Sequence, residues 1–290
     1  MKQAMKSPAF VLCLTLAAST AFAQTPRIVN ARLTARAAEP DLRRAIAAIA
    51  RQHIEPASLG YAVPMFSRSA EGRTGGQDGW SERCRLEQSN VDAGTSSIGA
   101  AGPVRLEPAS TLLVLMRLQN REVQRIRALS SDCAIDAGGL PVYWLDGVNA
   151  AQSVDFLKGF APGANTRSTS DGPLAALSLH RDASAAAALL DLARNSGDTR
   201  VRQRALFWVA MRAESQAVAA ITDAMERDPD LEVKKQAVFA LSRLPSDQGI
   251  PLLITLARSS SNPTVRKQAM FWLGQSRDPR AIGFFEEMLR

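Results

Sequence analysis

A nine-residue block recurs three times in the C-terminal half of the chain, at a fixed spacing of 32 residues. The copies are VRQRALFWV at 201–209, VKKQAVFAL at 233–241 and VRKQAMFWL at 265–273. The last two agree at six of nine positions, where unrelated sequences would agree at about one. Units this short cannot bury their apolar side chains alone, so the spacing predicts a stack of repeats.

Each repeat is expected to contain two helices. Asp198, Asp230 and Asn262 stand three residues before the repeated valines, and such side chains cap helix N-termini. A second helix is predicted from apolar residues that are in register farther along, namely Val218, Ile250 and Ile282. A weaker unit aligns without gaps before them. We therefore predict an all-α solenoid of about four helical hairpins over residues 170–290.

These repeats resemble HEAT repeats, in particular the short bacterial subtype called phycobilisome-lyase HEAT-like. The residues that carry the resemblance are Asp198-x-x-Val201-Arg202-x-x-Ala205, its counterparts beginning at Asp230 and Asn262, and Gly274-x-x-x-Asp278-Pro279-x-Ala281. The resemblance implies a scaffold that binds a partner, without catalytic residues, cofactor or metal. The iron-binding His-Glu dipeptides of HEAT-type deoxyhypusine hydroxylases are absent, because Ile54 follows His53 and Arg181 follows His180.

The first 23 residues have the features of a secretory signal. Lys2 and Lys6 precede an apolar run from Ala9 to Ala18, and Ala21-Phe22-Ala23 offers small residues to a signal peptidase. The run is too short for a stable membrane-spanning helix. We expect cleavage after Ala23, a periplasmic or secreted protein, and no integral membrane segment in the mature chain. An uncleaved anchor is the alternative.

Two cysteines, Cys84 and Cys133, remain after the signal. An even number of cysteines in an exported chain predicts a disulfide bond. The alternatives are a metal site, which would need a spacing such as C-x-x-C, and a catalytic thiol, which would need a histidine. No motif ties His53 or His180 to either cysteine, so the structural disulfide is favoured.

Residues 24–147 predict a small α+β domain with an antiparallel sheet. Residues 59–66, 111–118 and 122–129 have strand patterns, and Gln119-Asn120-Arg121 favours a hairpin between the last two. Leu140–Leu145 is expected at an edge because it contains Pro141. Residues 148–169 are expected to form a linking helix, capped by Asn149, and a loop.

A column of basic residues is the main candidate binding site. Arg202, Lys234 and Arg266 recur every 32 residues, and Lys235 and Lys267 stand beside two of them. Positive charge in the first turn of a helix is opposed by the helix dipole, so it needs compensation. One explanation is pairing with acids that recur in register, namely Asp198, Asp230 and Glu232. The other is an anionic partner.

Aromatic residues also recur in the repeats. Trp208 and Trp272 occupy matching positions, where core packing is favoured and a groove lining is the alternative. The column Phe207, Phe239 and Phe271 is expected to be buried.

Charge and motifs narrow the function. Removal of Lys2 and Lys6 lowers the net charge from +7 to +5, which permits attraction to anionic surfaces but does not call for nucleic acid. The chain has no G-x-S-x-G, P-loop or H-E-x-x-H motif. We predict an exported, non-catalytic scaffold for a protein or peptide partner. The alternatives are an adaptor that binds an anionic envelope component through the basic column, and an enzyme with its site in the N-terminal domain.

Overall fold

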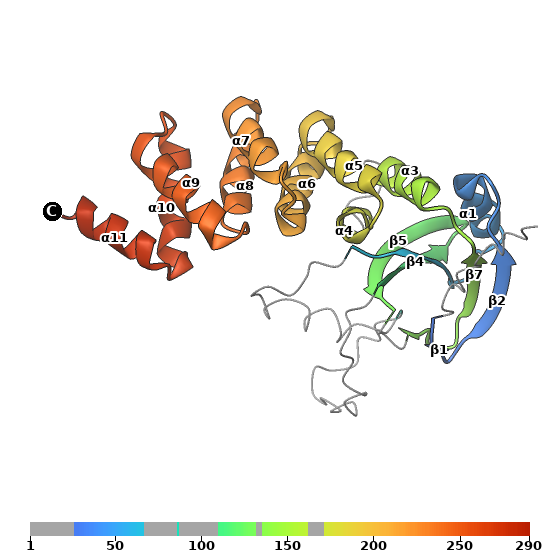
Figure 1. Cartoon of the computed structure of the whole chain (residues 1–290). Helices are drawn as coiled ribbons and strands as arrows, with labels where there is room; N and C mark the ends of the chain where they lie inside the picture. Colours follow the sequence, from blue (N-terminus) through green and yellow to red (C-terminus); the bar gives the residue numbers. More distant parts are fainter. Residues whose placement is uncertain (1–25, 67–85, 87–109, 132–134, 162–170) are drawn as a thin grey trace, which may run out of the picture.

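The computed structural model describes residues 26–66, 86, 110–131, 135–161 and 171–290 (Figure 1). The predicted signal sequence, Cys84 and Cys133 lie outside these residues, so the expected cleavage and disulfide stay predictions. The described part has a sheet at one end and a run of helices that leads away from it. The predicted order, an α+β part followed by an all-α solenoid, is confirmed.

The N-terminal part is built on a five-stranded sheet. Its order is β2-β7-β3-β4-β5, and β1 and β6 form a separate pair. The strands are β1 Ile28–Val29, β2 Arg32–Ala37, β3 Ala57–Pro64, β4 Thr111–Gln119, β5 Glu122–Ser130, β6 Ile135–Asp136 and β7 Pro141–Asp146.

The sheet is mixed, so the antiparallel prediction is wrong for half of it. β3, β4 and β5 are antiparallel, and the predicted hairpin turns at Asn120 and Arg121, both with positive φ. In contrast, β7 lies parallel to both β2 and β3. The chain crosses over through α1 (Leu42–Ala50) between β2 and β3, which makes these two strands point the same way.

The edge position predicted for Leu140–Leu145 is also wrong, because β7 lies between β2 and β3. Pro141 is the first residue of this strand, where its missing N–H is tolerated even in the middle of a sheet. The end strands of the sheet are instead β5 and β2, and the six residues of β2 are all exposed.

Four helical hairpins follow α3 (Ala150–Phe160), as predicted. Their helices are α4 Asp171–Leu179, α5 Ala183–Asn195, α6 Thr199–Arg212, α7 Ala217–Arg227, α8 Leu231–Leu241, α9 Ser246–Ser259, α10 Pro263–Ser276 and α11 Pro279–Met288. The first helices, α4, α6, α8 and α10, pack side by side in one row (Figure 1). The second helices α5 and α7 pack against each other in the other row.

The predicted N-caps are confirmed. Side-chain oxygens of Asp198, Asp230 and Asn262 each accept a hydrogen bond from the backbone N–H two residues on, at 2.8–2.9 Å. Each cap satisfies an N–H group that has no partner inside the helix. The three caps therefore fix the starts of α6, α8 and α10 at the same place in the repeat.

One apolar core runs from the sheet into the solenoid. It contains Tyr61 and Met116 on one face of the sheet, Leu174 of α4 and Leu206 of α6. A second core, around Trp144, covers the opposite face of the sheet. Gly172 lets the start of α4 approach the sheet, because an added Cβ would lie 1.9 Å from the carbonyl oxygen of Ile126. The core is thus continuous across the boundary expected at residues 148–169.

Arg212 joins the end of α6 to the first hairpin and the sheet. Its buried guanidinium donates hydrogen bonds to the carbonyl oxygens of Leu177, Ser178 and His180, at 2.7–3.2 Å, and pairs with Glu214. Its Cζ lies 4.4 Å from the ring centroid of Phe66, just beyond β3. A charge removed from water in this way is stable only because carbonyls and a carboxylate surround it.

Candidate functional site

Arg202, the first residue of the basic column, forms a largely buried ion pair. Arg202 Nε lies 2.8 Å from Asp228 Oδ2, and Arg202 Nη1 donates to the carbonyl oxygen of Ser196 at 2.8 Å. Both side chains of the ion pair are largely buried, with exposed fractions of 11% and 7%. The hydrogen bond with Asp228 raises the pKa of Arg202. The partner is Asp228, and not one of the acids in register.

The other members of the column make equivalent contacts. Lys234 Nζ donates to the carbonyl oxygen of Glu226 at 2.9 Å, and Arg266 Nη1 donates to that of Ser260 at 2.6 Å. Each cation therefore reaches the C-terminal end of the preceding second helix, where the helix dipole favours positive charge. This contact supplies the compensation that the column needs.

The two flanking lysines differ from the column. Lys235 Nζ lies 2.7 Å from Glu232 Oε1 within α8. Lys267 is exposed on α10. Lys267 therefore leaves positive charge at the surface of α10, whereas Glu232 offsets the charge of Lys235.

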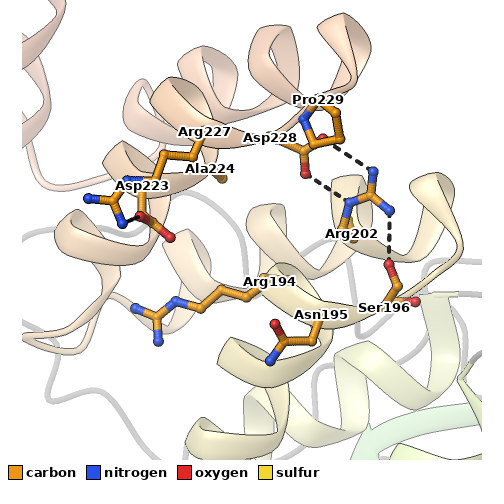
Figure 2. A pocket seen from close by; sticks show the side chains of 10 residues that line it. Arg194, Asn195, Ser196, Arg202, Asp223, Ala224, Arg227, Asp228 and Pro229 are labelled. Carbon is orange, nitrogen blue, oxygen red and sulfur yellow. Dashed lines mark hydrogen bonds and ion pairs between the residues drawn. The ribbon is translucent and has the colours of Figure 1, made fainter.

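A pocket of about 360 Å³ lies between α5 and α7 (Figure 2). The Arg202–Asp228 pair stands at one end of it, and the pair Arg227–Asp223, 2.9 Å apart, stands at the other. Arg194 also lines it and forms no ion pair with any residue that the structure describes. Since most charges of the pocket neutralise each other, it offers little selectivity for an ion of either sign.

Aromatic side chains form a continuous row across α6, α8 and α10. We define the aromatic ladder as Phe207, Phe239, Trp272 and Phe271. The rings of Phe207 and Phe239 are stacked, with centroids 6.0 Å apart and planes 5° apart. The Phe239–Trp272 and Trp272–Phe271 centroids are 4.7 and 4.9 Å apart. The ladder thus spans three hairpins.

The ladder is partly exposed to solvent, which contradicts the expected burial of the phenylalanine column. Phe271 is 51% exposed, and Phe207 and Phe239 are half-buried. The neighbouring positions of the repeat are the buried ones, including Leu206, Val238, Leu241 and Leu273. The first helices are apolar on nearly every side, so the sequence pattern does not show which side faces the core.

The two tryptophans at matching positions have different environments. Trp208 is buried, as expected for core packing. Trp272 is half-buried and its ring belongs to the ladder, while its buried Nε1 finds no hydrogen-bond partner among the described residues.

Polar and cationic residues border the ladder. Gln203, Lys235 and Lys267 each precede a ladder phenylalanine by four residues, which places them one turn away on the same helix face. Arg243 extends over Phe239, with 4.8 Å between its Cζ and the ring centroid. Sequence reasoning missed Arg243 and the stacking of the rings, because both depend on how neighbouring helices pack.

The histidines have structural surroundings. His180 is fully buried, and its Nδ1 accepts a hydrogen bond from the backbone N–H of Asp182 at 3.2 Å. Burial lowers the pKa of His180 to about 4. His53 packs against Tyr143, with centroids 4.9 Å apart. Within the described ranges, no group of three or more His, Cys, Asp or Glu side chains is arranged to hold a metal ion.

Comparison with protein families identifies HEAT repeats, which match residues 186–270 and 218–290. Residues 186–290 are therefore similar to HEAT repeats, a class of repeat that generally mediates protein interaction. No curated protein matches the sequence. Among the described helices, none combines the length and apolar character needed to cross a membrane.

Proposed function

We propose that this protein is an exported, non-catalytic HEAT scaffold that binds a protein or peptide partner through the aromatic ladder. The observation that carries the proposal is the ladder itself, which runs without interruption from α6 to α10 and ends in the half-exposed ring of Phe271. Solenoids bind through surfaces that cross several repeats, since equivalent residues line up there.

The composition of the ladder fits a protein partner. Aromatic side chains supply large contact areas and are enriched where proteins bind one another. Met211, 42% exposed near the end of α6, adds a flexible apolar side chain to the same helix. Lys267 and Arg243 give the border of this surface a positive charge, and Glu232 offsets that of Lys235. We therefore expect a partner segment with apolar anchors and acidic neighbours.

The alternative of an anionic envelope component depends on the basic column. The contacts of Arg202, Lys234 and Arg266 with Asp228 and with helix carbonyls compete with such a role. An anion would have to displace these contacts before it could bind. This competition favours the ladder over the basic column as the binding surface.

Export and the Cys84–Cys133 disulfide belong to the same proposal. Protein purified from the envelope fraction should begin at Gln24, and thiol titration without reduction should find no free cysteine. A first residue upstream of Gln24 would contradict cleavage, and two reactive thiols in the mature chain would contradict the disulfide. Mass spectrometry of the N-terminal peptide and thiol titration test the two points separately.

The binding surface can be mapped by photocrosslinking in cells. A benzophenone amino acid at Gln275, one turn beyond Phe271 on α10, should give a discrete adduct with a partner. The matched control is Thr255, which is also exposed but lies on the second helix α9. Adducts from Thr255 and none from Gln275 would show that the ladder is not the binding surface.

A further inference from the structure

The exposed edge of the sheet has features of a second binding site, independent of the solenoid. β2 is the end strand of the order β2-β7-β3-β4-β5, and it pairs with β7 alone. All six of its residues are exposed, and none belongs to either apolar core. Packing therefore contributes little to this strand, which is held mainly by its hydrogen bonds to β7.

The register shows which backbone groups point away from the sheet. The N–H of Ala38 donates to the carbonyl oxygen of Asp146 in β7, at 2.7 Å. In a parallel pair, alternate residues bond the same neighbour, so Thr34 and Arg36 also direct their backbone groups toward β7. Leu33, Ala35 and Ala37 then direct N–H and C=O groups outward, and no described residue bonds them there.

The side chains of β2 give this edge a definite charge. Arg32, Thr34 and Arg36 share one face because strand residues alternate, and the two arginines are about 13 Å apart. Arg36 lies over the ring of Tyr143, with 5.2 Å from its Cζ to the centroid. Neither arginine forms an ion pair with a described residue. The other face offers Leu33, which is 44% exposed.

We propose that β2 is a docking edge for an extended acidic peptide segment, which adds to the sheet as a sixth strand. The outward N–H and C=O groups bind its backbone, as in other cases of strand addition. Its carboxylates, on alternate residues, meet Arg32 and Arg36 on one face, and an apolar residue contacts Leu33 on the other.

A second copy of this chain is a poorer occupant. If two β2 strands paired antiparallel about Thr34, Arg32 of each copy would stand opposite Arg36 of the other. Like charges directly opposite each other destabilise a strand pair. The charge that discourages self-association is the charge that an acidic strand would neutralise.

The test uses fluorescent nine-residue peptides and the purified full chain. A capped peptide of alternating Glu and Val should bind, and a Lys–Val peptide should not. With Arg32→Glu and Arg36→Glu together, the Glu–Val affinity should fall about tenfold or more and the Lys–Val peptide should gain affinity. Both arginines are exposed, so melting curves should show an unchanged fold.

Backbone methylation separates strand addition from plain ionic attraction. N-methylation of one alternate set of residues should abolish binding, and methylation of the other set should leave it, because only one peptide edge faces β2. If the Glu–Val peptide bound equally well to the Arg32→Glu/Arg36→Glu variant, the proposal would be overturned. An equal loss of binding with either set of methyl groups would overturn it as well. A third result would also overturn it: the Arg32→Ser/Arg36→Ser variant self-associates, and the unchanged protein binds no peptide. The arginines would then only shield the edge from a second copy.

Discussion

The sheet end of the solenoid and its last hairpins use the same repeat positions differently. Trp208 of α6 is 7% exposed, while Trp272, its counterpart in α10, is half-buried. Phe207 is half-buried, and Phe271 at the equivalent position is 51% exposed. Near the sheet, aromatic side chains serve the core, and farther along they remain available at the surface. We therefore expect the residues that stabilise the fold to lie mainly near the sheet, and the proposed binding surface to lie toward the last hairpins.

The largest effect is expected at the junction with the sheet. Arg212→Met should lower the free energy of unfolding by about 3–5 kcal/mol, because three buried carbonyl oxygens lose their donor. Arg227→Met is the control, since its side chain is 80% exposed and its loss should cost about 0.5 kcal/mol or less. Urea unfolding of both variants measures the contrast. Equal losses would mean that the junction does not concentrate stability.

The buried histidine makes stability depend on pH. The pKa of His180 is lowered from 6.5 to about 4, so the unfolded chain binds a proton below pH 6.5 that the folded protein binds only near pH 4. Stability should therefore fall as the pH drops from 6.5 to 4, by up to about 3 kcal/mol. His180→Gln should flatten this slope in urea titrations. An unchanged slope in the variant would show that other groups cause it.

The basic column should contribute unevenly along the array. Arg202→Met removes a largely buried ion pair and should cost about 2 kcal/mol. Lys234→Met removes one exposed contact with the carbonyl of Glu226 and should cost about 0.5 kcal/mol. Thermal melts compare the two variants. A larger loss at Lys234 would reverse the order that the burial of these contacts predicts.

Local signals made the solenoid predictable. The caps Asp198, Asp230 and Asn262 act within three residues of themselves, so a periodic sequence displays them directly. The same holds for the hairpin at Asn120 and Arg121. These features need no knowledge of which elements meet in space.

The features that the sequence did not predict correctly depend on contacts with residues far away in the sequence. Arg212 contacts carbonyls 32–35 residues earlier in the chain, which no local pattern signals. The edge position predicted for β7 is wrong because its parallel partners, β2 and β3, are separated from it in sequence. The exposed side of the first helices depends on which side their neighbours cover, and the surroundings of Phe239 follow from that.

The central claim is that the exposed end of the aromatic ladder, at Phe271, binds a partner and contributes little to the stability of the fold. Leu241→Ala, which removes a buried side chain two residues after Phe239 and on the other side of α8, should cost about 2–5 kcal/mol. Phe271→Ser, at a half-exposed position, should cost about 1 kcal/mol or less. The most direct measurement therefore combines Phe271→Ser with the photocrosslinker at Gln275. We predict an almost unchanged melting temperature and loss of the partner adduct. An adduct of unchanged yield in a normally folded Phe271→Ser protein would contradict the account.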